Sequence, residues 1–134
     1  MNLNNDAPVI YQIEPKPLVT VLRFPFLFGS LNTLLRTHRW KRSELRDKYF
    51  YLIRSMTTHQ HKGRVRIEYS RSSSASRKMD YDNLVSSVKV VTDALVKAGV
   101  IVDDNQNIIV EQTHEHVLTS RNVLPFTVIK ITDL

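Results

Sequence analysis

Four segments of the chain predict β-strands. The first is a compact β-branched run before Pro25, and the second alternates apolar and polar residues, a period of two that is typical of strands that bury one face. In the second segment Val65, Ile67 and Tyr69 share one side, while the residues between them are charged and mostly basic. The predicted strands cover residues 18–24, 64–69, 107–117 and 124–131.

Two other segments repeat their apolar residues at helical spacing. The first predicts a helix over 43–56, with Ser43 as the N-cap residue. The second predicts a helix over 83–98, with Asp82 as its cap and Gly99 as a left-handed C-terminal stop. The element order is therefore β-α-β-α-β-β, which predicts an α+β fold: a small mixed sheet of about four strands with two main helices on one face.

The length of 134 residues fits a single domain. Residues 1–17 are rich in Asn and Pro and predict an extended N-terminal arm, which leaves 18–134 as the folded domain. The absence of cysteine excludes disulfides, thiolate metal sites and a cysteine nucleophile. No apolar stretch approaches the roughly 20 residues of a membrane helix, and a cytoplasmic location is expected.

The chain carries 19 Lys and Arg residues against 13 Asp and Glu residues, a formal charge of +6. Such a field attracts a polyanion, and nucleic acid is preferred over an anionic membrane surface because no lipid anchor or amphipathic membrane helix is evident. Trp40, within a basic run placed in a loop, either stacks on an unpaired base or anchors the loop to the core or to a second subunit. The candidate nucleic-acid contacts are Arg36, Arg39, Lys41, Arg42, Arg71, Arg77 and Lys78.

Two short acidic clusters stand out in this basic chain: Asp80 with Asp82, and Asp103 with Asp104. Crowded carboxylates repel one another unless a cation neutralises them, and oxygen ligands of this kind suit Mg²⁺. A bound divalent ion could activate water and stabilise a phosphoryl transition state, so a nuclease is the first hypothesis. The alternative is that these residues are only helix caps and turns.

The residues from Asp80 to Gln106 include Asp-x-Asp-Asn-Leu, then Asp-Ala-Leu-x-Lys-Ala-Gly, then Asp-Asp-x-Gln. This succession resembles the core of the RusA family of Holliday-junction resolvases. The resemblance implies a homodimeric, Mg²⁺-dependent endonuclease, with Mn²⁺ as a substitute ion, that nicks four-way DNA junctions symmetrically. It implies that Asp80, Asp82 and Asp104 are the catalytic, metal-binding carboxylates, with Asp103 as a further ligand beside them.

The chain departs from the family pattern where that pattern usually places a catalytic lysine, because Ser86 occupies the position. Lys89 lies seven residues after Asp82 and four before Asp93, and the second spacing is the family's own. Three extra residues near the start of the helix would explain this, with Lys89 either replacing the family lysine or remaining a solvated helix residue. By the same resemblance, Asn32 is a polar contact near the site.

Two histidines, His114 and His116, share one face of the third predicted strand. Their spacing suits zinc, but the remaining ligands are missing, so solvent-facing side chains are expected instead. Two other functions stay open: a basic junction-binding protein with little or no nuclease activity, and an RNA-binding or ribosome-associated module.

Overall fold

The computed structural model describes residues 16–29 and 39–134, with side chains from Lys41 onward in the second range. Four strands form one mixed sheet in the order β1-β4-β2-β3, in which β2 and β3 run parallel and the other pairs antiparallel. The strands are β1 (Val19–Phe24), β2 (Val65–Ser73), β3 (Ile109–Leu118) and β4 (Phe126–Asp133).

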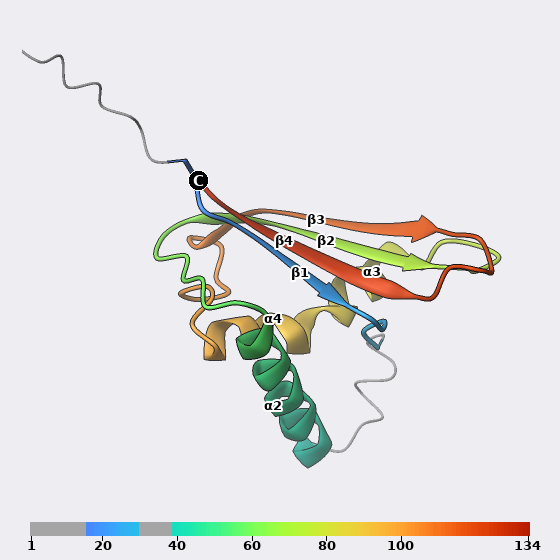
Figure 1. Cartoon of the computed structure of the whole chain (residues 1–134), viewed down its shortest axis with the longest axis horizontal. Coiled ribbons are helices and arrows are strands. Elements are labelled where there is room, and N and C mark those ends of the chain that lie inside the picture. The colour runs from blue at the N-terminus through green and yellow to red at the C-terminus, as the bar shows by residue number, and fades with distance from the viewer. Residues whose placement is uncertain (1–15, 30–38) are drawn as a thin grey trace, which may run out of the picture.

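The described helices are α2 (Arg39–Met56), α3 (Tyr81–Ser87) and α4 (Lys89–Lys97). Figure 1 shows all three on the same side of the sheet, while the described helices leave its other side uncovered. The predicted α+β class and the order β-α-β-α-β-β are confirmed, with α3 and α4 together forming the second main helix. No helix of the described ranges is long and apolar enough to cross a membrane.

The core lies between the sheet and the helices, because β1, β2 and β4 each turn a row of apolar residues to that side. Ile53 of α2 and Val91 and Leu95 of α4 are fully buried against them. Burying one such side chain contributes about 1.5–3 kcal/mol. The fully buried strand residues include Leu22, Phe24, Val65, Ile67, Ile129 and Ile131.

The ends of β1, β3 and β4 differ from the predicted ones by one or two residues, and two larger differences bear on the site. Helix α2 begins at Arg39, so the residues after it in the basic run belong to a helix and not to a loop. Strand β2 continues to Ser73 because β3 pairs along it on one side to that residue, with Ser73 opposite Leu118. Its last residues are polar, so the hydrophobic alternation ended too early to reveal them.

The second predicted helix is interrupted at Val88. Its backbone angles, φ −97° and ψ 6°, depart from the helical region, and its N–H bonds to the Ser86 carbonyl, which ends α3. Helix α4 then starts at Lys89 and ends before Gly99, which has φ 75° and so serves as the left-handed stop that was predicted. The break falls where the extra residues were inferred.

A β-bulge changes which side chains of β3 face the helices. Val65 pairs with Ile109, but Arg66 pairs with Glu111, so Val110 is an extra residue in β3. Beyond the bulge the alternation is reversed relative to Ile109. His114 and His116 therefore lie on the helix side of the sheet, opposite Tyr69 and Arg71 of β2.

A buried hydrogen-bond chain joins the ends of β1 and β4. The Oγ1 of Thr20 lies 2.7 Å from His61 Nε2, and His61 Nδ1 lies 2.6 Å from Asp133 Oδ1. Thr20 also contacts His59 Nδ1 at 2.8 Å. The order resembles a hydrolase triad, but Thr20 is only 3% exposed and His61 1%. A substrate could not reach the buried Thr20 hydroxyl. These hydrogen bonds therefore stabilise the packing of the β1 and β4 ends against each other.

Candidate functional site

Asp80 and Asp82 lie at the start of α3, directly after the segment that follows β2. Asp80 is the N-cap residue and its backbone carbonyl accepts the Leu84 N–H at 2.9 Å, but its side chain does not cap the helix. The predicted capping role of Asp82 is wrong, because the helix already begins at Tyr81. Both carboxylates are exposed and bond to no described residue. They remain available to an external cation.

Asp103 is engaged in its own turn. One of its oxygens accepts the Asp104 backbone N–H at 2.7 Å and the other accepts the Asn105 amide at 3.1 Å. The bond from the Asp104 N–H is the main reason that the pKa of Asp103 lies below its usual value. The alternative reading, a turn residue, therefore describes Asp103 well.

Asp104 is exposed and lies beside α4, at a shallow hollow that Asp93 and Lys97 also line. The chain reaches this place by turning back after Gly99, where the Val100 N–H bonds to the Leu95 carbonyl at 3.0 Å. Burial raises the pKa of Tyr69 to about 12, and the Asp104 carboxylate adds to that rise. The Asp104 carboxylate is therefore close enough to Tyr69 to influence it electrostatically.

The two acidic clusters are not joined within one chain. Among the described residues no three acidic or histidine side chains come close enough to hold a metal together. Asp80 lines one hollow, whereas Asp104 lines another beside α4. The donor chemistry of the Asp80–Asp82 pair fits a hard divalent cation, but the described residues do not assemble a complete three-carboxylate site.

Lys89 and Ser86 lie on opposite sides of the helix break. The Ser86 hydroxyl donates to the Asn83 carbonyl at 3.0 Å, so it is bound to its own helix. Lys89 is the first residue of α4, is exposed, and pairs with no described residue.

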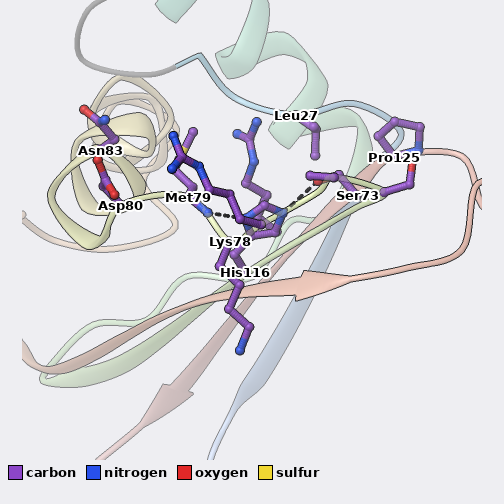
Figure 2. Close-up of a pocket in the computed structure, with 12 residues that line it drawn as sticks. Leu27, Ser73, Lys78, Met79, Asp80, Asn83, His116 and Pro125 are labelled. Carbon is purple, nitrogen blue, oxygen red and sulfur yellow. Dashed lines mark hydrogen bonds between the residues drawn. The ribbon is translucent and has the colours of Figure 1, made fainter.

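A basic hollow of about 500 Å³ opens beside Asp80. Figure 2 shows Asp80 and Asn83 on the α3 side of it and Pro125 and Leu27 on the opposite side. Three of its residues are cationic and two are serines. The lining residues are Leu27, Arg71, Ser73, Ser74, Ala75, Arg77, Lys78, Met79, Asp80, Asn83, His116 and Pro125. We call it the Ser73 hollow.

His116 forms the floor of the Ser73 hollow, between β2 and the start of α3. Its Nε2 lies 2.7 Å from Ser73 Oγ, and its Nδ1 accepts the Met79 backbone N–H at 2.8 Å (Figure 2). Burial first, and then the charges of Arg71 and Lys78, lower the pKa of His116. The expectation of solvent-facing histidines is wrong here, because the bulge in β3 turns His116 inward, where it is 6% exposed.

His114 is also half-buried. Its ring stacks on Tyr69 with centroids 4.8 Å apart, and Tyr81 meets it edge-on at 6.1 Å. Burial lowers the pKa of His114. This histidine therefore packs the first turn of α3 onto the sheet.

The predicted DNA contacts are distributed over two regions. Arg71 donates to the Phe28 carbonyl at 2.7 Å and so anchors the chain after β1 while lining the Ser73 hollow. Arg77 and Lys78 are exposed at its rim. The second region is α2 and the segment before it, where each predicted DNA contact is either exposed or outside the described residues. Lys41 and Arg42 are exposed, whereas Asn32, Arg36 and the side chains of Arg39 and Trp40 lie outside the described residues.

Ser73 and His116 were missed as functional candidates from the sequence. Ser73 belongs to a run of serines that predicts a flexible loop, and the phase of β3 depends on a bulge that hydrophobicity does not reveal. The one available signal was the pair of histidines on one strand face, whose second ring proved to be the buried one.

The comparisons with known proteins give one family match. The family model described as Endodeoxyribonuclease RusA matches residues 34–132. The matched range includes both acidic clusters, the helix break and the Ser73 hollow apart from Leu27. A comparison with curated proteins finds no match.

Proposed function

The chain belongs to the RusA family of endodeoxyribonucleases, and we propose that it resolves four-way DNA junctions by paired, symmetric nicks in a Mg²⁺-dependent reaction. Family membership makes it a junction-resolving endodeoxyribonuclease; the metal, the symmetry and the residues are the proposal. One observation carries it: Asp80, a carboxylate without a partner among the described residues, borders a basic hollow, and Asp82, equally unpaired, lies two residues further in the same matched range.

Asp80 and Asp82 are the residues that would hold the metal, and Asp104, which lines a separate hollow, is the third ligand that the family resemblance implies. Asp103 is the weaker candidate because both of its oxygens already accept hydrogen bonds. When bound, Mg²⁺ would lower the pKa of a water molecule and neutralise charge on the scissile phosphate. Without it, the exposed carboxylates would repel the DNA backbone, so substrate and cation bind best together.

The remaining site residues act on the DNA itself. Arg77 and Lys78 attract the phosphodiester backbone toward the carboxylates. Lys89, at the start of α4, would stabilise charge on the transition state or the leaving oxygen. These roles are compatible with side chains that are exposed and pair with no described residue.

A homodimer completes the proposal. A four-way junction presents two cleavage positions related by two-fold symmetry, and a dimer with one site in each subunit has the same symmetry. Paired nicks then follow from one binding event.

The test compares wild type with Asp82→Asn on a synthetic four-way junction and on a supercoiled plasmid that extrudes a cruciform. Wild type with Mg²⁺ should convert the plasmid to linear product, because two symmetric nicks sever both strands. Asp82→Asn should bind the junction yet cleave it at least about 100-fold more slowly, since a bound metal lowers the activation barrier by several kcal/mol. EDTA should abolish wild-type cleavage, and added Mg²⁺ should restore it.

Asp47→Asn is the matched control, because Asp47 is an exposed carboxylate on α2 that pairs with Lys97 at 2.7 Å. It should cleave like wild type. Nicked circles without linear product would contradict symmetric cleavage, and equal rates for Asp82→Asn and wild type would contradict the site.

The alternative is a junction-binding protein with little or no nuclease activity. The displaced lysine motivates it, since Ser86 occupies the family position and Lys89 follows the helix break. Tight junction binding without any cleavage in Mg²⁺ or Mn²⁺ would favour this alternative.

A further inference from the structure

The hydrogen bonds of His116 leave one hydroxyl proton uncommitted in the Ser73 hollow. The Met79 backbone N–H can only donate, so Nδ1 of His116 must present its lone pair. The neutral imidazole then carries its proton on Nε2. That N–H donates to Ser73 Oγ at 2.7 Å.

Ser73 therefore receives a hydrogen bond and keeps its own O–H free to donate. It makes no other side-chain bond to a described residue. Ser73 is only 7% exposed, and its exposed part opens onto the hollow. His116 thus holds the Ser73 hydroxyl in place, and its O–H can donate a hydrogen bond to a ligand in the hollow.

The surroundings select an anionic acceptor. Arg71, Arg77 and Lys78 line the same hollow, and Ser74 adds a second hydroxyl. The positive charges of Arg71 and Lys78 reach its floor, where they disfavour a proton on His116. A phosphate oxygen accepts hydrogen bonds and carries the complementary charge.

The position of the hollow decides which phosphate it receives. Asp80 lies on its α3 side, so an occupant is adjacent to one of the carboxylates that were proposed to direct cleavage (Figure 2). A DNA strand whose scissile phosphate lies at those carboxylates would carry a neighbouring phosphate into the hollow.

We propose that the Ser73 hollow binds one backbone phosphate of the DNA strand, next to the cleaved bond, through the Ser73 hydroxyl, with His116 as its positioning residue. This inference rests on the proposed function, since the neighbouring carboxylates give the bound phosphate its place. Such a phosphate contact would fix the position of the DNA strand in the site without distinguishing one base from another.

The experiment measures binding to four-way junctions in EDTA, with single phosphates near the cleavage site replaced one at a time by neutral methylphosphonates. In wild type, one replacement beside the cleaved bond should weaken binding about tenfold, the usual effect of a lost hydrogen bond to a charged group. Ser73→Ala should weaken binding of the unmodified junction by a similar factor and should be insensitive to that same replacement.

Ser72→Ala is the matched control, because Ser72 is equally buried on the same strand but does not line the hollow. It should retain the wild-type response to every methylphosphonate. Identical responses of Ser73→Ala and wild type at all positions would overturn the proposal.

Two further measurements use only the wild-type protein, so they do not depend on whether a variant folds. Nitrogen NMR of the imidazole should find the His116 proton on Nε2, and an Nδ1–H tautomer would overturn the positioning role. Titration with inorganic phosphate should shift the amides of Ser73 and Met79 saturably, and a junction should compete. Phosphate shifts without any methylphosphonate effect would assign the hollow to small phosphates and overturn the DNA contact.

Because binding is measured without cleavage, the two proposals fail separately. A wild type that binds junctions but never cleaves them would contradict the resolvase proposal and leave the phosphate test valid.

Discussion

At the scale of single residues, the acidic side chains divide into engaged and unengaged ones. Asp103 is held by its own turn, and Asp133 by His61 at 2.6 Å. Asp80 and Asp82 bond to no described residue. A carboxylate without a protein partner in a basic molecule is better suited to an external cation than one that already stabilises the fold.

Acid sensitivity should follow from the two inward-facing histidines. Burial is the main reason that the pKa values of His114 and His116 lie below 6.5. As the pH falls, these two side chains therefore take up protons more readily in the unfolded chain than in the folded one. Their contribution to the free energy of unfolding is present above about pH 6.5 and is lost as the pH falls through their folded pKa values. Stability should therefore decrease on acidification.

Urea unfolding of wild type and of His116→Gln between about pH 7.5 and about pH 5 measures this loss of stability, because that range brackets the usual pKa of histidine. The slope of the unfolding free energy against pH should be shallower in the variant by up to about one proton. His114→Gln should change the slope in the same direction. Parallel slopes for all three proteins would contradict the assignment.

The residue scale also marks a limit of prediction. The acidic clusters were found because Asp-x-Asp and Asp-Asp are local patterns. Ser73 and His116 are 43 positions apart, and their bond forms only because β2 and β3 lie side by side. No local pattern records that contact.

At the scale of elements, the break at Val88 falls in the stretch where three extra residues were inferred from the spacing of Asp82, Lys89 and Asp93. The insertion itself stays a prediction. A continuous helix would have kept Lys89 in a fixed relation to Asp82. The break makes the place of Lys89 depend on the angle between α3 and α4. The catalytic role of Lys89 therefore stays a prediction.

Lys89→Ala tests that role. If the ammonium stabilises the transition state, single-turnover cleavage of a junction in Mg²⁺ should slow by about tenfold or more. Binding in EDTA should change little, because one of many cations is lost. Lys130→Ala is the control, since Lys130 is an exposed cation on the uncovered face of β4, away from both acidic clusters. Equal single-turnover rates for Lys89→Ala and wild type would make Lys89 a solvated helix residue.

The bulge in β3 is the second feature at the scale of elements, because it determines which side chains of β3 face the helices. Read from Ile109, strict alternation would turn Glu111, Thr113 and Glu115 toward the helices. The extra residue Val110 reverses this and turns the histidines inward instead. Such a shift is set by how two strands pair, so it is invisible in the hydrophobic pattern of one strand.

At the scale of the whole molecule, cations on the two sides of the sheet differ in whether protein groups engage them. On its uncovered face the cations are partly engaged: Arg66 pairs with Glu111 at 3.7 Å, and Arg23 lies 3.9 Å over the Phe126 ring. On the other side, Arg77 and Lys78 pair with no described residue and border the Ser73 hollow. The helix side should therefore face the DNA.

The salt dependence of junction binding tests this orientation. Each phosphate contact contributes about −0.9 to the slope of log K against log salt concentration. Lys78→Ala should therefore make the slope shallower by about one. Lys130→Ala, which removes an exposed cation from the uncovered face of β4, should leave it unchanged. The opposite pattern would place DNA on the uncovered face.

Much of this architecture follows from the chain alone, because strand and helix periods, the left-handed Gly99 and the acidic motifs are properties of neighbouring residues. They sufficed for the fold class, the element order and the family. Three features depended on the tertiary structure: the break at Val88, the phase of β3, and the meeting of Ser73, His116 and Met79. Each depends on how distant segments pack against one another, which the local energetics of a segment do not specify.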